Sequence, residues 1–118
     1  MSFLIVDDNS VMRHAIGRIL RDLTDEIIEC ADGAQALLAY QANLPEWVLM
    51  DVEMAEKDGL TATREICAAY PKARIVIVTK YGDSAMREAA ARAGACGYVM
   101  KENLLELRGI LGRKQAEN

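Results

Sequence analysis

The sequence predicts an α/β domain in which five strands alternate with five helices, as a (βα)5 doubly wound parallel sheet lying between two layers of helices. Two observations support this fold class. Short apolar runs such as 47–50 and 75–78 are typical of strands buried on both faces of a parallel sheet. Between such runs, apolar residues recur at helical spacing. This alternation favours βαβ units with right-handed crossovers.

The first half of the chain contains three predicted strands, at residues 3–6, 26–30 and 47–50. Asn9 or Ser10 is expected to cap a helix over residues 10–23. A second helix is expected to open at Asp32-Gly33 and to end before Pro45. Its predicted inner face carries Ala34, Leu37 and Leu38.

The second half contains predicted strands at 75–78 and 97–100. Asp58 is expected to cap the third helix, which Pro71 ends, with Leu60, Thr63, Cys67 and Tyr70 on its inner face. Asp83 or Ser84 should cap a fourth helix that ends at Gly94, with an inner face of Ala85, Ala89, Ala90 and Ala93. Leu104, Leu107 and Leu111 form the apolar seam of the fifth helix, and residues 112–118 are expected to fray.

Length and composition indicate one domain over residues 1–118, with 52% hydrophobic and 27% charged residues. The 18 acidic against 14 basic residues argue against direct nucleic-acid binding, which needs a basic surface. No apolar run is long enough to span a membrane, so the expected location is the cytoplasm. Three scattered cysteines, Cys30, Cys67 and Cys96, are predicted to be reduced and mostly buried.

Polar residues follow the buried strands at their carboxyl ends. With the strand order 2-1-3-4-5, the direction of strand addition reverses between strands one and three. Ligands of such sheets bind at this reversal, beyond the carboxyl ends of the strands. These strands are followed by Asp7-Asp8 and Asp51, strand four by Thr79, and strand five by Lys101. Taken alone, Asp51 reads as a cap of the next loop. Three carboxylates together require a proton or a cation, and an all-oxygen site suits Mg²⁺. A hydroxyl and an amine beside them indicate phosphoryl transfer, with Asp51 as the acceptor.

This set of residues closely resembles the receiver domain of two-component response regulators, a flavodoxin-like three-layer sandwich. The resemblance runs from Phe3 to about Leu111 and includes the stretches 48–54, 58–60 and 93–98. It implies that Asp51 accepts a phosphoryl group from a histidine kinase or phosphotransfer protein and that the domain is a regulator, not an enzyme. The resemblance also implies that Asp8, Asp51 and the Glu53 carbonyl bind Mg²⁺ (or Mn²⁺), with Asp7 acting mainly through water. Thr79 and Lys101 would each contact an oxygen of the phosphoryl group. Tyr98 would be the aromatic side chain that changes position in the switch.

Three positions depart from the commonest receiver pattern. Ala55 and Glu102 stand where prolines are frequent, so a trans peptide is expected at Lys101–Glu102. Relatives without the second proline are frequent in the subgroup with helix-turn-helix DNA-binding output domains, and this is the subgroup that the sequence resembles most. Lys80 follows Thr79 where a small residue is usual. We expect Glu53 and Lys80 to meet over the site and partly shield it.

The predicted function is a Mg²⁺-dependent phosphoacceptor switch that signals through the face of the fourth helix, fifth strand and fifth helix. The expected partners are a kinase, a downstream protein or DNA-binding output domain, and a second copy in a phosphorylation-dependent homodimer. No output domain is found in the chain. Two alternatives stay open: a pseudo-receiver that docks without being phosphorylated, and a metal-dependent phosphohydrolase with Asp51 as nucleophile.

Overall fold

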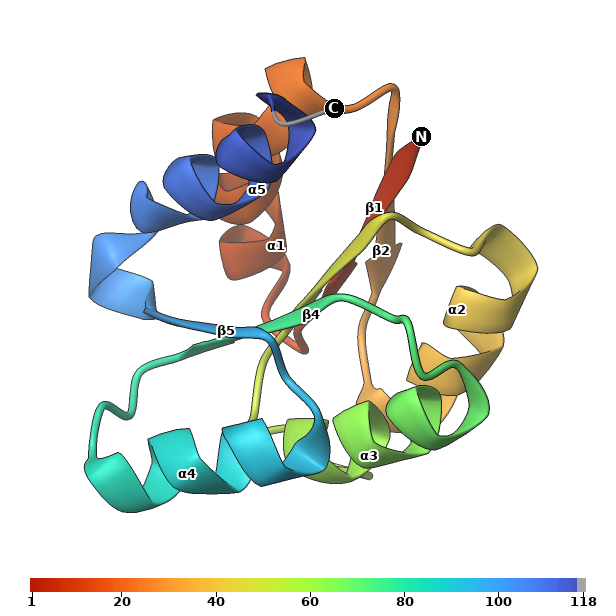
Figure 1. Ribbon diagram of the computed structural model, residues 1–118, viewed down its shortest axis with the longest axis vertical. Coiled ribbons are helices and arrows are strands. Elements are labelled where there is room, and N and C mark those ends of the chain that lie inside the picture. The colour runs from red at the N-terminus through yellow and green to blue at the C-terminus, as the bar shows by residue number, and fades with distance from the viewer. Residues whose placement is uncertain (117–118) are drawn as a thin grey trace.

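The structure, a computed structural model, describes residues 1–116 and forms one parallel sheet between two layers of helices (Figure 1). The strand order is β2-β1-β3-β4-β5, and every pair is parallel. The fold class and strand order predicted from the sequence are therefore confirmed. The strands are β1 (Ser2–Val6), β2 (Glu26–Cys30), β3 (Trp47–Met50), β4 (Ile75–Thr79) and β5 (Gly97–Met100).

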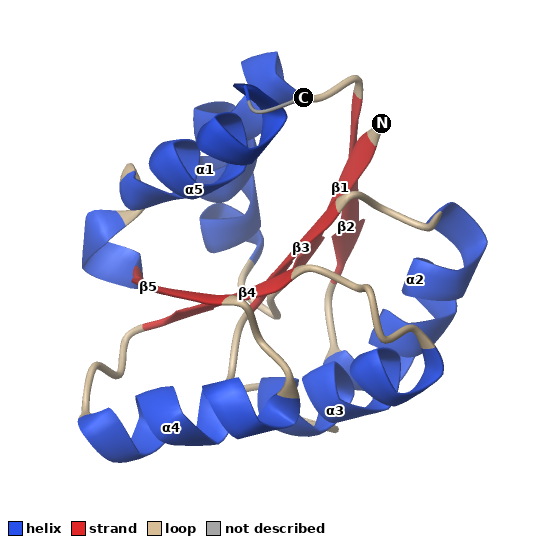
Figure 2. Cartoon of the chain, viewed as in Figure 1, coloured by secondary structure: helices blue, strands red, loops and turns tan. Residues whose placement is uncertain are grey.

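Helices cover both faces of this sheet (Figure 2). Helices α1 and α5 lie together on one face, and α2, α3 and α4 lie side by side on the other. The helices are α1 (Ser10–Leu20), α2 (Ala36–Asn43), α3 (Gly59–Ala69), α4 (Ser84–Ala93) and α5 (Glu106–Ala116). Short 3₁₀ segments occupy Arg21–Leu23, Gly33–Gln35 and Lys101–Asn103.

The core has two halves because successive side chains of a strand point to opposite faces of the sheet. In β1, Phe3 and Ile5 pack with α1 and α5, while Leu4 and Val6 pack with α2 and α3. All four side chains are fully buried. The continuous apolar run of β1 is thus explained by helices on both sides.

Most helix starts follow the predicted capping chemistry. The side chains of Asn9, Asp32, Asp58 and Asp83 each accept a backbone N–H from the residue three positions later. Asp32 caps a 3₁₀ turn, so α2 begins only at Ala36. Every peptide bond in residues 1–116 is trans, as expected at Lys101–Glu102.

Four side-chain predictions are wrong. Ala34 and Leu38 are exposed, because the face of helix two that packs on the sheet carries Gly33, Ala36 and Tyr40 instead. Ala85 is exposed in the first turn of α4, whereas Ala90 and Ala93 are buried. Cys96 is exposed because it lies in the loop between α4 and β5.

The last predicted element also differs. Helix α5 continues to Ala116, beyond the expected fraying point at 112, and residues 117–118 lie outside the described part of the chain. Within residues 1–116, no helix combines the length and apolarity needed to cross a bilayer.

Candidate functional site

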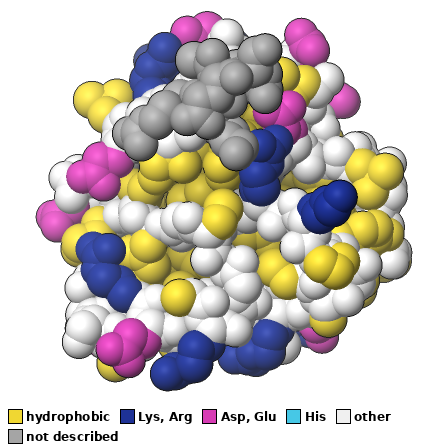
Figure 3. Space-filling model, in the orientation of Figure 1, with side chains coloured by type: hydrophobic (Ala, Val, Ile, Leu, Met, Phe, Trp, Pro, Cys, Tyr) yellow, Lys and Arg dark blue, Asp and Glu magenta, His cyan; other side chains and the backbone are white. Residues whose placement is uncertain are grey.

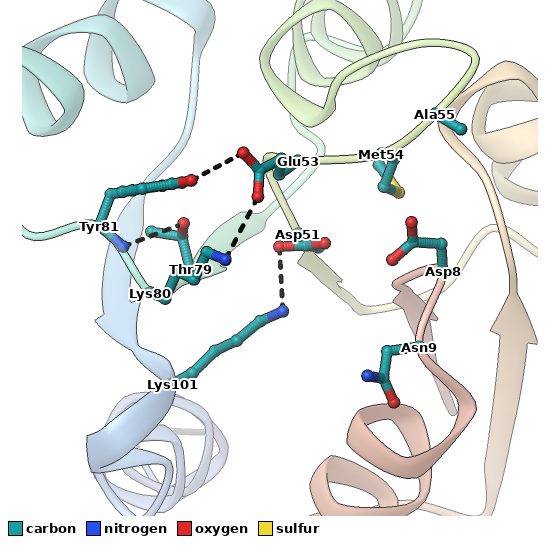
Figure 4. A pocket seen from close by; sticks show the side chains of 10 residues that line it. All are labelled: Asp8, Asn9, Asp51, Glu53, Met54, Ala55, Thr79, Lys80, Tyr81 and Lys101. Carbon is teal, nitrogen blue, oxygen red and sulfur yellow. Dashed lines mark hydrogen bonds and ion pairs between the residues drawn. The ribbon is translucent and has the colours of Figure 1, made fainter.

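The carboxyl ends of β1, β3, β4 and β5 meet around a crevice of about 410 Å³ (Figure 4). Its walls come from the loops that follow these strands. The lining residues are Asp8, Asn9, Asp51, Glu53, Met54, Ala55, Thr79, Lys80, Tyr81 and Lys101. The predicted site residues Asp8, Asp51, Thr79 and Lys101 are thus brought to one place, and Asp7 lies directly behind them through its contact with Lys101.

Asp51 forms the floor of the crevice and is only 4% exposed. Its backbone N–H donates to the Val6 carbonyl at 2.9 Å, which continues the β1–β3 hydrogen bonding one residue beyond the strand. Burial is the main cause that raises the pKa of Asp51, and the charge of Asp7 adds to it, while Lys101 acts in the opposite direction. A positive charge beside such a carboxylate, here Lys101, favours its ionised form.

Asp7 and Asp8 differ sharply in environment. Asp7 is 1% exposed, and its Oδ1 accepts the Asn9 N–H at 2.9 Å. Its Oδ2 accepts no hydrogen bond of good geometry from the described residues and has only the ion pair with Lys101. Asp8 is exposed and faces the crevice. Asp7 is therefore a fixed buried charge, and Asp8 is accessible.

Lys101 is the counter-charge of the acidic group. Its Nζ lies 3.0 Å from Asp7 Oδ2 and 3.2 Å from Asp51 Oδ1. Burial by itself lowers the pKa of Lys101, but the contacts with Asp7 and Asp51 outweigh this effect, so the pKa is raised. Lys101 thus stays protonated and bridges β1 and β3 from the end of β5.

One oxygen from each of Asp7, Asp8 and Asp51 lies within 4.8 Å of the others. A cluster of three carboxylates matches the preference of Mg²⁺ for oxygen ligands. The residues present therefore fit a hard divalent cation, with the open side of the crevice left for water or a phosphoryl group.

Thr79 is the last residue of β4 and lines the crevice, and Tyr98 lies on the neighbouring edge strand β5. Thr79 is 1% exposed, and its Oγ1 accepts the Tyr81 N–H at 3.3 Å. Tyr98 is partly buried, and its hydroxyl donates to the Tyr81 carbonyl. The Arg87 guanidinium lies over the Tyr98 ring, 4.5 Å from its centre. Both side chains therefore contact the same loop residue, Tyr81.

A second cluster, formed by Glu53, Lys80 and Tyr81, also lines the crevice (Figure 4). Lys80 Nζ lies 3.5 Å from Glu53 Oε1, as expected, although both side chains are more than 60% exposed. The Tyr81 hydroxyl donates to Glu53 Oε2 at 2.7 Å, and this hydrogen bond lowers the pKa of Glu53. Sequence reasoning missed Tyr81. Its position two residues after Thr79, in the same loop as Lys80, is the signal that could have indicated it.

Hydrophobic side chains gather between α4 and α5, along the edge strand β5 (Figure 3). A groove of about 200 Å³ lies along α4 and β5 and includes Arg87 and Tyr98. Tyr98 therefore lines a surface groove at the β5 edge of the sheet.

Comparison with known proteins agrees with this geometry. The family model of the response regulator receiver domain matches residues 3–110. The chain is 39% identical over 99 residues to the chemotaxis protein CheY of Bacillus subtilis, covering 83% of this chain and 82% of that protein. It is 32% identical to the uncharacterized transcriptional regulatory protein YhcZ of Bacillus subtilis, covering 95% of this chain and 55% of that protein.

Solved structures show the same relationship. A two-component response regulator of the LuxR family from Aurantimonas sp. SI85-9A1 superposes with a TM-score of 0.83 and 30% identity, over 95% of this chain and 85% of that one. The chemotaxis protein CheY4 of Vibrio cholerae superposes with a TM-score of 0.86 and 25% identity, over 95% of this chain and 96% of that one. The chain belongs to the family of response regulator receiver domains of two-component systems.

Proposed function

We propose that this domain is a phosphoacceptor switch in which Asp51 receives a phosphoryl group from the phosphohistidine of a histidine kinase or phosphotransfer protein. Receiver domains are regulatory and interact with kinases and output domains. The observation that carries the proposal is the placement of Asp51, a nearly fully buried carboxylate on the floor of an open crevice, 3.2 Å from the Lys101 ammonium. A structural aspartate at a strand end needs neither the crevice nor the ammonium.

Receiver domains bind Mg²⁺ at an acidic pocket, and the aspartate cluster supports such binding here. In the proposed site Asp8, Asp51 and the Glu53 carbonyl would hold the cation, and Asp7 would act mainly through water. Mn²⁺ would use the same ligands. The cation, when bound, offsets the negative charge of the carboxylates and the incoming phosphoryl oxygens.

The proposed transfer forms a bond between an Asp51 carboxylate oxygen and phosphorus, while the bond from phosphorus to the histidine nitrogen breaks. The electron pair of that bond stays on the imidazole of the donor. Lys101 then moves from its ion pairs with the carboxylates to a phosphoryl oxygen, and the Thr79 hydroxyl donates to another. Lys101 already lies within reach of Asp51, which supports this assignment.

The modification adds a charge of about −1.5 to −2 at Asp51. Thr79 and Lys101 stabilise that charge only in one arrangement of their loops, so phosphorylation shifts an existing equilibrium between two states. We assign Tyr98 as the side chain that transmits the shift, because Tyr98 and Thr79 both contact Tyr81. The α4–β5–α5 face then regulates a downstream protein, a DNA-binding output domain, or a second copy of the domain.

We further propose that residues 1–118 act as one receiver domain in the cytoplasm and make no direct contact with nucleic acid. Two functions compete with the switch. The Glu53–Lys80 contact over the crevice favours a docking module that is never phosphorylated. A phosphohydrolase with Asp51 as nucleophile would need a cap over its substrate.

One experiment separates the three functions. The protein and its Asp51→Asn variant are incubated with acetyl phosphate or beryllofluoride, with Mg²⁺ and with EDTA. For a switch, we expect the wild-type protein to be modified with Mg²⁺ and not with EDTA. The Asp51→Asn variant is expected to stay unmodified in both. Unmodified protein under all conditions indicates a docking module, and continuous turnover of a small phosphate ester indicates a hydrolase.

A further inference from the structure

Arg13 on α1 makes two contacts behind the acidic site that the proposed function does not use. Its Nη1 donates to the backbone carbonyl oxygen of Asp7 at 2.6 Å, and its Nε donates to Glu29 Oε1 at 2.8 Å. The Arg13 side chain is only 16% exposed. A guanidinium with two directed contacts, one to the residue after β1 and one to β2, is held in one orientation.

The sheet register explains why Glu29 is available. Ile5 pairs with Glu29 between β1 and β2, and Ile5 belongs to the half of the core under α1 and α5. Paired residues of parallel strands point to the same face, so Glu29 also faces α1. Arg13 therefore bridges the end of β1 and the edge strand from the helix that follows β1.

The carbonyl that Arg13 holds belongs to the peptide joining Asp7 to Asp8. The orientation of this peptide sets the direction in which the Asp8 side chain leaves the backbone. Asp7 is already fixed by burial and by the Asn9 N–H on its Oδ1. Asp8 is exposed, so its placement depends on the backbone that carries it.

The charges of Arg13 and Glu29 oppose each other. A guanidinium behind the site repels a divalent cation, and the Glu29 carboxylate offsets that repulsion. The other Glu29 oxygen lies 3.9 Å from His14 Nε2, on the same exposed side of α1. Because the net charge of the Arg13–Glu29 pair is zero, its effect on cation binding is chiefly geometric.

We propose that Arg13 is a positioning residue for the divalent-cation site, acting through the Asp7–Asp8 peptide and neutralised by Glu29. This inference rests on the proposed function, because it assumes that the acidic site binds Mg²⁺. The charge of Arg13 and its positioning role predict opposite changes in Mg²⁺ affinity. Loss of the positive charge alone would strengthen cation binding, whereas loss of the hydrogen bond to the Asp7 carbonyl would weaken it.

The test is Mg²⁺ affinity, measured by isothermal titration calorimetry on the whole chain. Arg13→Gln is expected to weaken Mg²⁺ binding by about 10-fold or more, as for other partners that orient metal ligands. Arg18→Gln is the matched control, because Arg18 is an exposed arginine on the same helix. It removes the same charge and is expected to leave the affinity unchanged or slightly higher.

Arg13→Lys keeps the charge but cannot make both directed contacts with one ammonium. It is expected to bind Mg²⁺ more weakly than wild type and serves as the test if Arg13→Gln does not fold. Thermal unfolding in EDTA verifies that each variant is folded. Affinity equal to or higher than wild type, in either folded Arg13 variant, overturns the positioning role. A wild-type protein that binds no Mg²⁺ would instead overturn the proposed function, and the positioning role with it.

Discussion

The backbone carbonyl of Asp51 lies directly against Gly59, so that a β-carbon at position 59 would stand 1.8 Å from the Asp51 oxygen. The Gly59 N–H also donates to the Val52 carbonyl at 2.8 Å. Helix α3 therefore starts in contact with the backbone of the proposed phosphoacceptor. Only a residue without a side chain permits this approach.

Gly59→Ala should force α3 and the Asp51 loop apart. We expect a loss of about 1–3 kcal/mol in the free energy of unfolding, together with weaker Mg²⁺ binding. Gly112→Ala is the control, since no described atom lies within 4 Å of a β-carbon at position 112. That change in α5 should raise stability by up to about 1 kcal/mol. Urea unfolding of both variants measures the effect, and losses of equal size would contradict the packing argument.

Asp51→Asn should change how stability depends on pH. Burial is the main cause that raises the pKa of Asp51, and the charge of Asp7 adds to it. The folded protein therefore binds a proton on Asp51 more tightly than the unfolded chain does. The resulting stabilisation is present below the unfolded pKa and is lost as pH rises through the folded pKa. Each unit of raised pKa corresponds to about 1.4 kcal/mol.

We therefore expect Asp51→Asn to be more stable than wild type near neutral pH in EDTA, with the difference shrinking as pH falls toward about 4. Chemical denaturation across this pH range measures the difference. A difference that stays constant, or one that grows in acid, would contradict the raised pKa.

Lys80→Ala tests whether the Glu53–Lys80 contact shields the site. Both side chains are largely exposed, so the free energy of unfolding should change by no more than about 1 kcal/mol. If the pair hinders access, the aspartyl phosphate should hydrolyse faster in the variant, by no more than about fivefold. Lys72→Ala, at another exposed lysine, is the control. An unchanged lifetime would remove the shielding role.

Tyr98→Phe removes the hydroxyl that donates to the Tyr81 carbonyl and keeps the ring under Arg87. Loss of one hydrogen bond should lower the free energy of unfolding by about 0.5–1.5 kcal/mol. Modification of Asp51 by beryllofluoride should persist, because Tyr98 does not line the crevice. NMR chemical shifts of α4 should respond less to beryllofluoride than in wild type. An α4 response of full size would contradict the switch role.

Much of the fold could be predicted because the strands are short apolar runs and the helix starts carry capping aspartates. Once the strand order is that of a doubly wound sheet, the residues after β1, β3, β4 and β5 must meet at one edge. This reasoning placed Asp51, Thr79 and Lys101 together without a structure. It failed for Leu38, because the docking of helix two on the sheet buries Ala36 and Tyr40 and leaves Leu38 on the outer side.

The sequence by itself determined the alternation of strands and helices, the two-sided burial of the central strands and the set of side chains at their carboxyl ends. Periodicity and capping are local, so they can be read along the chain. Only the tertiary structure decided which distant residues support that set. The contact of Arg13 with Asp7 and Glu29, the approach of Gly59 to Asp51 and the position of Tyr81 between Glu53 and Tyr98 all depend on strand register and helix docking. These relationships join segments far apart in sequence, and no local pattern encodes them.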